Sequence, residues 1–185
     1  MFWLLCVAIT NNSFGQDTVL TNRSFDKGTQ LLSLSYGVIT QASGIAKSIG
    51  QKKDYSIFGP LKWSYEIGVS EDIGVAPKLN YAHVIDKTFD PQLYYGAVHI
   101  GVFGYYHFGR LINAPKVDLF AGVGGYMGVV FTDNGGSGST DYASNAFPAL
   151  SCGARYYLTH SFAFFAEVGA MRQSFVDLGF TIKVK

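Results

Sequence analysis

The sequence predicts an all-β fold, specifically an eight-stranded antiparallel up-and-down barrel. Apolar and polar residues alternate with period 2 in eight separate stretches, which is typical of strands with one apolar and one polar face. Turn-forming residues separate these stretches, and no apolar pattern with a helical period runs for a useful length. We therefore expect consecutive strands that pair with their neighbours and close into a barrel.

The last stretch of the chain shows the alternation most clearly. One of its faces is apolar and consists of Val176, Leu178, Phe180, Ile182 and Val184. The opposite face is polar or small and consists of Asp177, Gly179, Thr181 and Lys183. In chain order the eight expected strands are Gln30–Val38, Phe58–Val69, Asp72–Ala82, Tyr94–Phe108, Lys116–Phe131, Phe147–Tyr157, Phe162–Met171 and Val176–Val184.

The composition fits one domain of an unusual kind. The chain has 185 residues, of which 15% are charged and 16% aromatic, and it contains 22 glycines. This is a low charge and a high glycine and aromatic content for a soluble domain. The net charge of +1 gives no indication of a nucleic-acid partner. No apolar run reaches the length of about 18 residues that a transmembrane helix needs.

The N-terminal part is expected to lie outside the barrel. Residues 1–16 are interpreted as a secretory signal peptide, with an apolar run at 2–9 and small residues Ser13 and Gly15 before the cleavage point. The positive n-region is missing, so we expect the start to be truncated or misassigned. Residues 17–28 are predicted to be an irregular segment, and residues 29–185 the barrel. Without the signal peptide Cys152 is a single cysteine, and we interpret it as a small apolar packing residue.

Long and short connections alternate along the chain. The long connections are Ile39–Ile57, His83–Leu93 and Thr132–Ala146, whereas Ser70–Glu71 and Leu158–Ser161 are short. Small membrane barrels have long loops outside and short turns on the periplasmic side. The connections therefore favour a transmembrane β-barrel, although the short turn Arg172–Gln173 breaks the pattern.

The polar faces are predicted to point into the barrel. They are rich in Gly and Ser, which suit a narrow lumen better than a surface in water. They also carry equal numbers of opposite charges, as a closed interior requires because buried charges must be paired. The expected interior charge network consists of Lys62, Glu66, Lys78, Asp118, Arg155, Glu167, Asp177 and Lys183. We expect Tyr105, Tyr126, Tyr157 and Phe165 to fill the remaining space, without an open channel.

Aromatic residues are predicted to form two girdles at the membrane interfaces. The outer girdle is expected to contain Tyr36, Tyr81, Tyr94, Phe131 and Phe147. The inner girdle is expected to contain Tyr106, Phe108, Tyr156 and Phe162.

One hairpin resembles a known family. Gly153, Arg155–Leu158, a turn and Phe162–Glu167 are similar to a Gly-x-Arg-Tyr-Tyr-Leu, turn, Phe-Ala-Leu-Phe-Ala-Glu pattern. This pattern recurs in the small OmpA/OmpX-type outer-membrane β-barrel proteins of Bacteroidota. The resemblance implies a cell outer membrane location and insertion by the barrel-assembly machinery. Many such barrels end in an aromatic residue, whereas this chain ends in Val184–Lys185.

The residues that could support chemistry are dispersed. His99 and His107 share the lumen face, but the strand between them separates them by roughly 27 Å, too far to bind one ion. His160 and Ser161 are neighbours whose side chains are expected to point to opposite faces, unlike a nucleophile and its base. The run 122–128 is rich in glycine but lacks the spacing of a nucleotide-binding motif. We expect no catalytic, metal or cofactor site, and no enzymatic activity.

The leading functional hypothesis is a monomeric structural or interaction platform that acts through its extracellular loops. Its expected partners are outer-membrane lipid, lipopolysaccharide and a protein that binds the loops. Three alternatives remain open: an auxiliary component of an envelope secretion or assembly complex, a lipid-modifying barrel enzyme, and a soluble lipocalin-like carrier with its faces reversed.

Overall fold

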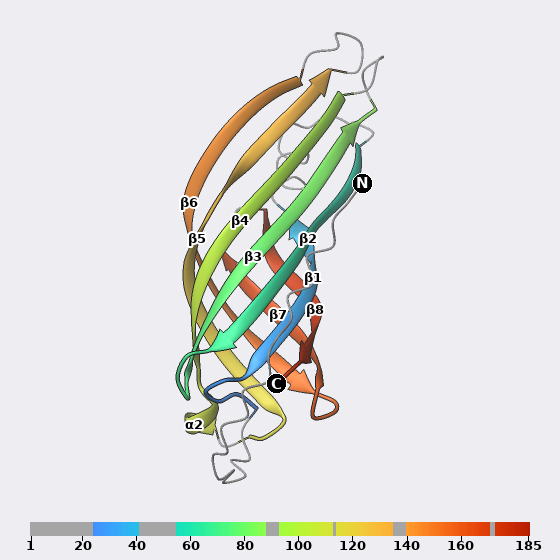
Figure 1. Ribbon diagram of the computed structural model, residues 1–185. Coiled ribbons are helices and arrows are strands. Elements are labelled where there is room, and N and C mark those ends of the chain that lie inside the picture. The colour runs from blue at the N-terminus through green and yellow to red at the C-terminus, as the bar shows by residue number, and fades with distance from the viewer. Residues whose placement is uncertain (1–23, 41–54, 88–92, 113, 135–139, 171–172) are drawn as a thin grey trace, which may run out of the picture.

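The computed structural model describes residues 24–40, 55–87, 93–112, 114–134, 140–170 and 173–185. The predicted signal peptide, the segment 17–23 and the central part of each long loop lie outside these residues. Eight strands form a closed barrel in which each strand is antiparallel to its neighbours (Figure 1). The predicted fold class and strand order are therefore confirmed.

The strands follow one another around the barrel in chain order. They are β1 (Gln30–Thr40), β2 (Tyr55–Gly68), β3 (Ile73–Asp86), β4 (Leu93–His107), β5 (Val117–Asn134), β6 (Thr140–Tyr157), β7 (Phe162–Ala170) and β8 (Ser174–Lys183). A four-residue helix, α2 (Gly109–Ile112), lies between β4 and β5. Among the described residues no helix is long and apolar enough to cross a membrane.

The first and last strands close the barrel. The ladder between β1 and β8 runs from Leu31 opposite Lys183 to Tyr36 opposite Leu178, and it continues with irregular register to Thr40. Closure removes both sheet edges within the membrane, where unpaired backbone groups cost several kcal/mol each. We use "inner end" for the end that holds the β2–β3 and β6–β7 turns and the C-terminus, because an even number of strands leaves both termini on the periplasmic side.

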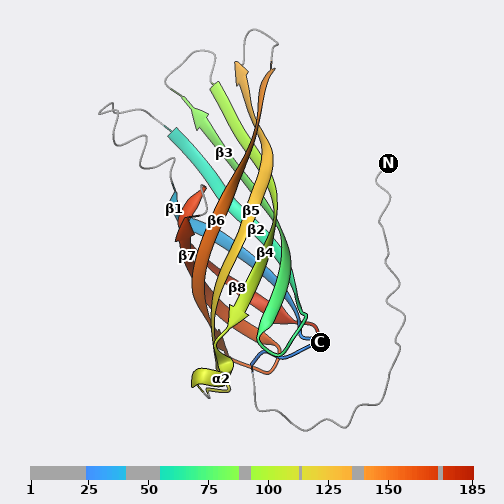
Figure 2. The same ribbon diagram turned by 90° about the vertical axis from the view of Figure 1, so that its left-hand side faces the viewer.

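The strands on one side of the barrel are longer than those on the other. Strands β5 and β6 have 18 residues each, whereas β7 has 9. Figures 1 and 2 show that β3 to β6 rise well past the outer ends of β7, β8 and β1. The β5–β6 ladder continues to Asp133 opposite Thr140.

The predicted loop Thr132–Ala146 is therefore wrong in extent, because most of it is strand. The predicted loops Ile39–Ile57 and His83–Leu93 are also shorter than expected, because β2 begins at Tyr55 and β3 ends at Asp86. Beyond the hydrocarbon layer the outward face need not be apolar. The alternation that marks a strand then disappears although the backbone pairing continues.

The polarity of the barrel is the reverse of that of a soluble protein. Large apolar side chains point outward, such as Val102, Val123 and Leu150 at 60%, 61% and 61% exposure. Charged side chains point inward and are buried, such as Lys62 and Glu66 at 4% and 1%. An apolar outer wall suits lipid and not water. The soluble carrier alternative is therefore wrong.

Five aromatic side chains form the apolar part of the lumen: Phe103, Tyr105, Phe120, Tyr126 and Phe165. Four of these rings lie over a glycine directly opposite on the next strand. The pairs are Phe103 with Gly124, Tyr105 with Gly122, Tyr126 with Gly101, and Phe120 with Gly153. The inward glycines thus provide the space that the rings occupy, which explains the glycine-rich polar faces.

The first prediction concerns this packing. A Cβ at Gly101 would lie 2.5 Å from Cδ1 of Tyr126 and 2.6 Å from the Gly125 oxygen. Gly101→Val should therefore lower the free energy of unfolding by about 1–3 kcal/mol, as overpacking does. The measurement is urea unfolding in detergent micelles, followed by heat-modifiable gel mobility.

The matched control for this substitution lies on the same strand. A Cβ at Gly104 meets nothing within 4 Å. The free energy of unfolding of Gly104→Val should therefore be close to that of the native protein. Equal losses of this free energy for the two variants would contradict the role of Gly101 in packing.

Candidate functional site

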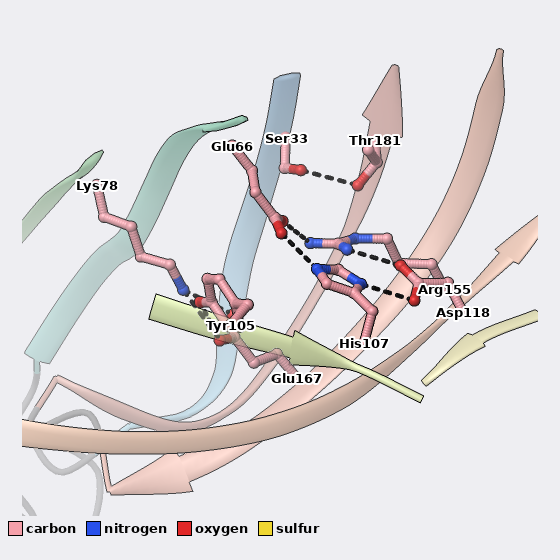
Figure 3. A network of polar contacts seen from close by, with 9 residues as sticks. All are labelled: Ser33, Glu66, Lys78, Tyr105, His107, Asp118, Arg155, Glu167 and Thr181. Carbon is pink, nitrogen blue, oxygen red and sulfur yellow. Dashed lines mark hydrogen bonds and ion pairs between the residues drawn. The ribbon is translucent and has the colours of Figure 1, made fainter. Parts of the chain in front are cut away.

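Four buried side chains form a closed ring of ion pairs near the inner end, which we call the inner quartet. It consists of Glu66 on β2, His107 on β4, Asp118 on β5 and Arg155 on β6 (Figure 3). His107 Nδ1 lies 2.8 Å from Asp118 Oδ1, and His107 Nε2 lies 2.6 Å from Glu66 Oε1. Arg155 Nη1 donates to Asp118 Oδ2 at 2.8 Å, and Nη2 donates to Glu66 Oε2 at 2.6 Å.

The quartet satisfies both of its carboxylates completely. Each carboxylate uses one oxygen for the histidine and the other for the arginine, and all four side chains are at most 5% exposed. The Arg155 guanidinium also lies 4.2 Å from the centroid of the Phe120 ring. Charge-assisted bonds of this kind are the strong class of hydrogen bond. The inner quartet therefore fixes the relative positions of four strands.

A second ion pair crosses the middle of the lumen. Lys78 Nζ on β3 donates to both oxygens of Glu167 on β7, at 2.9 and 3.0 Å. The hydroxyl of Tyr105 donates to the same carboxylate at 2.9 Å (Figure 3). Lys78 Nζ also lies 4.5 Å from the centroid of the Phe103 ring, a cation–π contact.

A third ion pair joins β2 and β8. Lys62 Nζ lies 2.5 Å from Asp177 Oδ2 and donates to Ser174 Oγ at 2.6 Å. Ser174 in turn donates to Asp177 Oδ1 at 2.5 Å. A separate hydroxyl pair, Ser33 and Thr181, spans β1 and β8 at 2.8 Å (Figure 3).

The eight residues of the predicted interior charge network differ in burial. Seven of the eight are buried in the three groups just described: Lys62, Glu66, Lys78, Asp118, Arg155, Glu167 and Asp177. The eighth, Lys183, is partly exposed and donates to the backbone oxygen of Ser24 at 3.0 Å.

The sequence analysis placed His107 on the lumen face but did not include it among the charges. His107 lies directly opposite Phe120, which shares the inward face of β5 with Asp118. The shared lumen face was the signal that could have placed His107 near this carboxylate.

The second lumen histidine belongs to a different cluster. His99 Nε2 lies 3.0 Å from Asn145 Oδ1, and Gln173 Nε2 lies 2.6 Å from His99 Nδ1. The Phe147 ring packs edge-on against His99, with centroids 5.5 Å apart. These side chains close the outer end of the lumen.

Phe147 is the member of the predicted girdles that the structure contradicts. It packs in the lumen against His99 and Tyr126 rather than facing lipid. The physical reason is strand parity, since Phe147 shares the face of Ser151 and Arg155, which point inward. The structure places the remaining eight girdle residues outside the lumen: Tyr36, Tyr81, Tyr94, Phe131, Tyr106, Phe108, Tyr156 and Phe162.

The arrangement offers little for catalysis. His160 and Ser161 are exposed in the β6–β7 turn, where Thr159 Oγ1 accepts the backbone N–H of Ser161 at 3.3 Å. Within the described residues no group of His, Cys, Asp and Glu is arranged to hold a metal ion. A cavity of ≈ 10 Å³ beside Lys62, Lys78 and Glu167 has room for about one water molecule.

Solved structures with the same architecture exist. The N-terminal β-barrel domain of Pseudomonas aeruginosa OprF is 15% identical, covers 85% of this chain and 98% of that domain, and has a TM-score of 0.55. The outer membrane protein OprG from Pseudomonas aeruginosa is 11% identical, covers 86% of this chain and 97% of that protein, and has a TM-score of 0.53. No family model and no curated protein matches the chain.

At these identities the likeness shows the fold. Together with the apolar outer wall and the charged lumen, the fold defines an outer-membrane β-barrel protein.

The second prediction concerns the inner quartet. Arg155→Leu leaves Glu66 and Asp118 buried with one cation fewer, so the free energy of unfolding should fall by about 3–5 kcal/mol. Urea titration of the folded barrel in detergent measures the change. Lys183→Met serves as the control, because Lys183 is partly exposed and bonds a backbone oxygen. Equal losses for the two variants would contradict the importance of the quartet.

The third prediction concerns the middle ion pair. Lys78→Met should strand the Glu167 carboxylate and destabilise the barrel by about 3–5 kcal/mol. The double variant Lys78→Met/Glu167→Leu removes both charges and should recover a large part of this loss. A double-mutant cycle from unfolding curves measures the coupling between the two positions. Additive losses would show that the pair does not act as a unit.

Proposed function

We propose that this protein is a membrane-anchored platform that binds a protein partner through its outer rim. The rim comprises the extended outer parts of β2 to β6 and the loops that they carry. The observation that supports this function is the outer edge of β6, which the described part of β7 does not reach. Among the described residues, β7 pairs with β6 only between Leu150 and Tyr157, so residues 140–146 of β6 pair with β5 alone.

The rim extends far beyond the membrane. A strand rises about 3.3 Å per residue and tilts by about 40° in such barrels, so the 9 residues of β7 span about 23 Å of height. The 18 residues of β6 span about 45 Å on the same basis. The apolar band of an outer-membrane barrel is about 25 Å tall. The outer part of β6 thus stands in the aqueous phase.

An exposed strand edge is a site where another chain can add a strand. The β6 edge includes exposed residues Tyr142, Ala143 and Ser144, with Tyr142 at 73% exposure. On the other side of the rim, the β1–β2 ladder of the described residues ends at Leu61, so residues 55–58 of β2 pair with β3 alone. The filled lumen argues against solute transport as the main role, which further supports an interaction function.

The hairpin resemblance to Bacteroidota barrels supports the barrel architecture on which this proposal rests. The secretion-complex alternative is a special case in which the partner belongs to an envelope assembly. The lipid-modifying alternative has no supporting observation in the described residues.

The fourth prediction tests the rim in cells. A photoreactive residue in place of Ser144 should crosslink to a specific protein, because this position lies on the outer edge of β6. The same residue in place of Leu150, which is 61% exposed on the outward face, should crosslink to lipid. Mass spectrometry of the adducts identifies the products.

Failure to crosslink any protein at 144, or the same products at both positions, would count against the proposal. Mass spectrometry of lipid A from cells with and without the gene distinguishes the enzymatic alternative.

A further inference from the structure

The segment before β1 closes the inner end of the barrel. We call residues 24–29 the strap. Three strands hold it: Gly28 N donates to Gly68 O on β2 at 2.8 Å, Ser24 Oγ donates to Val117 O on β5 at 3.2 Å, and Lys183 on β8 donates to Ser24 O at 3.0 Å. The strap side chains of Ser24, Phe25 and Thr29 are buried.

Phe25 connects the strap to the inner quartet. Its ring stacks on the His107 imidazole with centroids 3.5 Å apart and an interplanar angle of 6°. Phe25 is 3% exposed and His107 is 1% exposed. The strap thus covers one face of the imidazole, and carboxylates of the quartet contact both of its nitrogens. The protonation state of His107 therefore bears on the strap and on the quartet.

The hydrogen-bond geometry of the quartet requires one proton more than a neutral histidine supplies. Carboxylates only accept hydrogen bonds, and a neutral imidazole has a single N–H donor. Both His107 nitrogens face carboxylate oxygens, at 2.6 and 2.8 Å. A neutral ring would therefore point one lone pair at a carboxylate, whereas an imidazolium donates to Glu66 and to Asp118.

The charges around His107 support the same assignment. Arg155 on β6 provides one positive charge against the carboxylates of Glu66 on β2 and Asp118 on β5. With an imidazolium the quartet is neutral, and with a neutral imidazole it carries one net negative charge. The cation on β8, Lys183, is bonded to the strap backbone. The strap's own acid, Asp26, accepts the backbone N–H of Lys27 at 2.7 Å.

We propose that His107 is a proton-controlled latch that keeps the strap seated over the inner end. As an imidazolium it satisfies both carboxylates and presents a cationic ring to the face of Phe25, which is attractive. When it loses the proton, a lone pair opposes a buried carboxylate, the quartet is no longer neutral and the cation–π contact is lost. The strap then leaves the inner end, while the eight ladders keep the barrel closed. The latch is therefore closed at lower pH and opens as the pH rises.

The fifth prediction tests this latch by hydrogen exchange of the full chain in detergent micelles, after correction for intrinsic exchange rates. Protection of the amides of Gly28 and Thr29, which bond Gly68 O and Asp26 O, should be present below the pH at which His107 loses its proton and lost above it. The β4 amides should stay protected. Equal strap protection below and above that pH would overturn the proposal.

Two variants separate the proton from the packing. In Glu66→Gln the amide can donate to His107 Nε2, so a neutral imidazole suffices and strap protection should no longer depend on pH. In Phe25→Ala the quartet is intact but the stacked ring is missing, so the strap should be unprotected both below and above the pH at which His107 loses its proton. A pH dependence of Glu66→Gln like that of the native protein, or a protected strap in Phe25→Ala, would overturn the latch.

A measurement on the native protein does not depend on whether these variants fold. Nitrogen-15 spectra of the labelled imidazole should show two N–H groups on His107 at the lower pH, where the strap is protected, and one at the higher pH, where it is not. A single N–H at a pH at which the strap is protected would overturn the proposal.

Discussion

The lumen of an eight-stranded barrel is just wide enough for side chains, and the outer wall faces lipid. Every inward charge must therefore meet a partner across this narrow space, because hydrating water cannot reach it. Three of the ion pairs accordingly join strands that share no ladder: Lys78 on β3 with Glu167 on β7, Glu66 on β2 with Arg155 on β6, and Lys62 on β2 with Asp177 on β8. These ion pairs connect non-neighbouring strands across the lumen, whereas the strand ladders connect only neighbouring strands around the circumference.

The same narrowness explains the aromatic and glycine content. A ring fits in the lumen only where the facing position on the next strand has no Cβ, as for Phe120 opposite Gly153. The rings then lie beside the buried cations, and Phe120 and Phe103 each contact one of them. The aromatic and ionic parts of the interior are thus one packing arrangement. The rings fill volume and also solvate cations that have lost water.

The period-2 alternation of apolar and polar residues predicts the number, order and polarity of the strands. It does so because one face of each strand meets lipid and the other meets the lumen. It predicts which charges point inward but not how they pair, since pairing depends on the barrel's stagger. His107 illustrates this limit, because its carboxylate partners lie on β2 and β5, and only Asp118 is near in sequence. The outer parts of β5 and β6 could not be predicted, because strands in water need no apolar face. Phe147 is expected in the outer girdle if only its aromatic character is considered. Its even spacing from Arg155 on the same strand indicates the lumen instead, where it packs against His99.

Both ends of the lumen are closed, but by different chemistry. At the outer end His99 lies within hydrogen-bond distance of two neutral amides, Asn145 and Gln173, and packs against Phe147. At the inner end His107 bonds two carboxylates and packs against Phe25. A neutral amide can donate to or accept from either imidazole nitrogen, whereas an ionised carboxylate can only accept, so a neutral His107 can donate to only one of its two carboxylates. The inner closure therefore depends on the charge of its histidine, which gives the inner end of the lumen a reason to respond to pH.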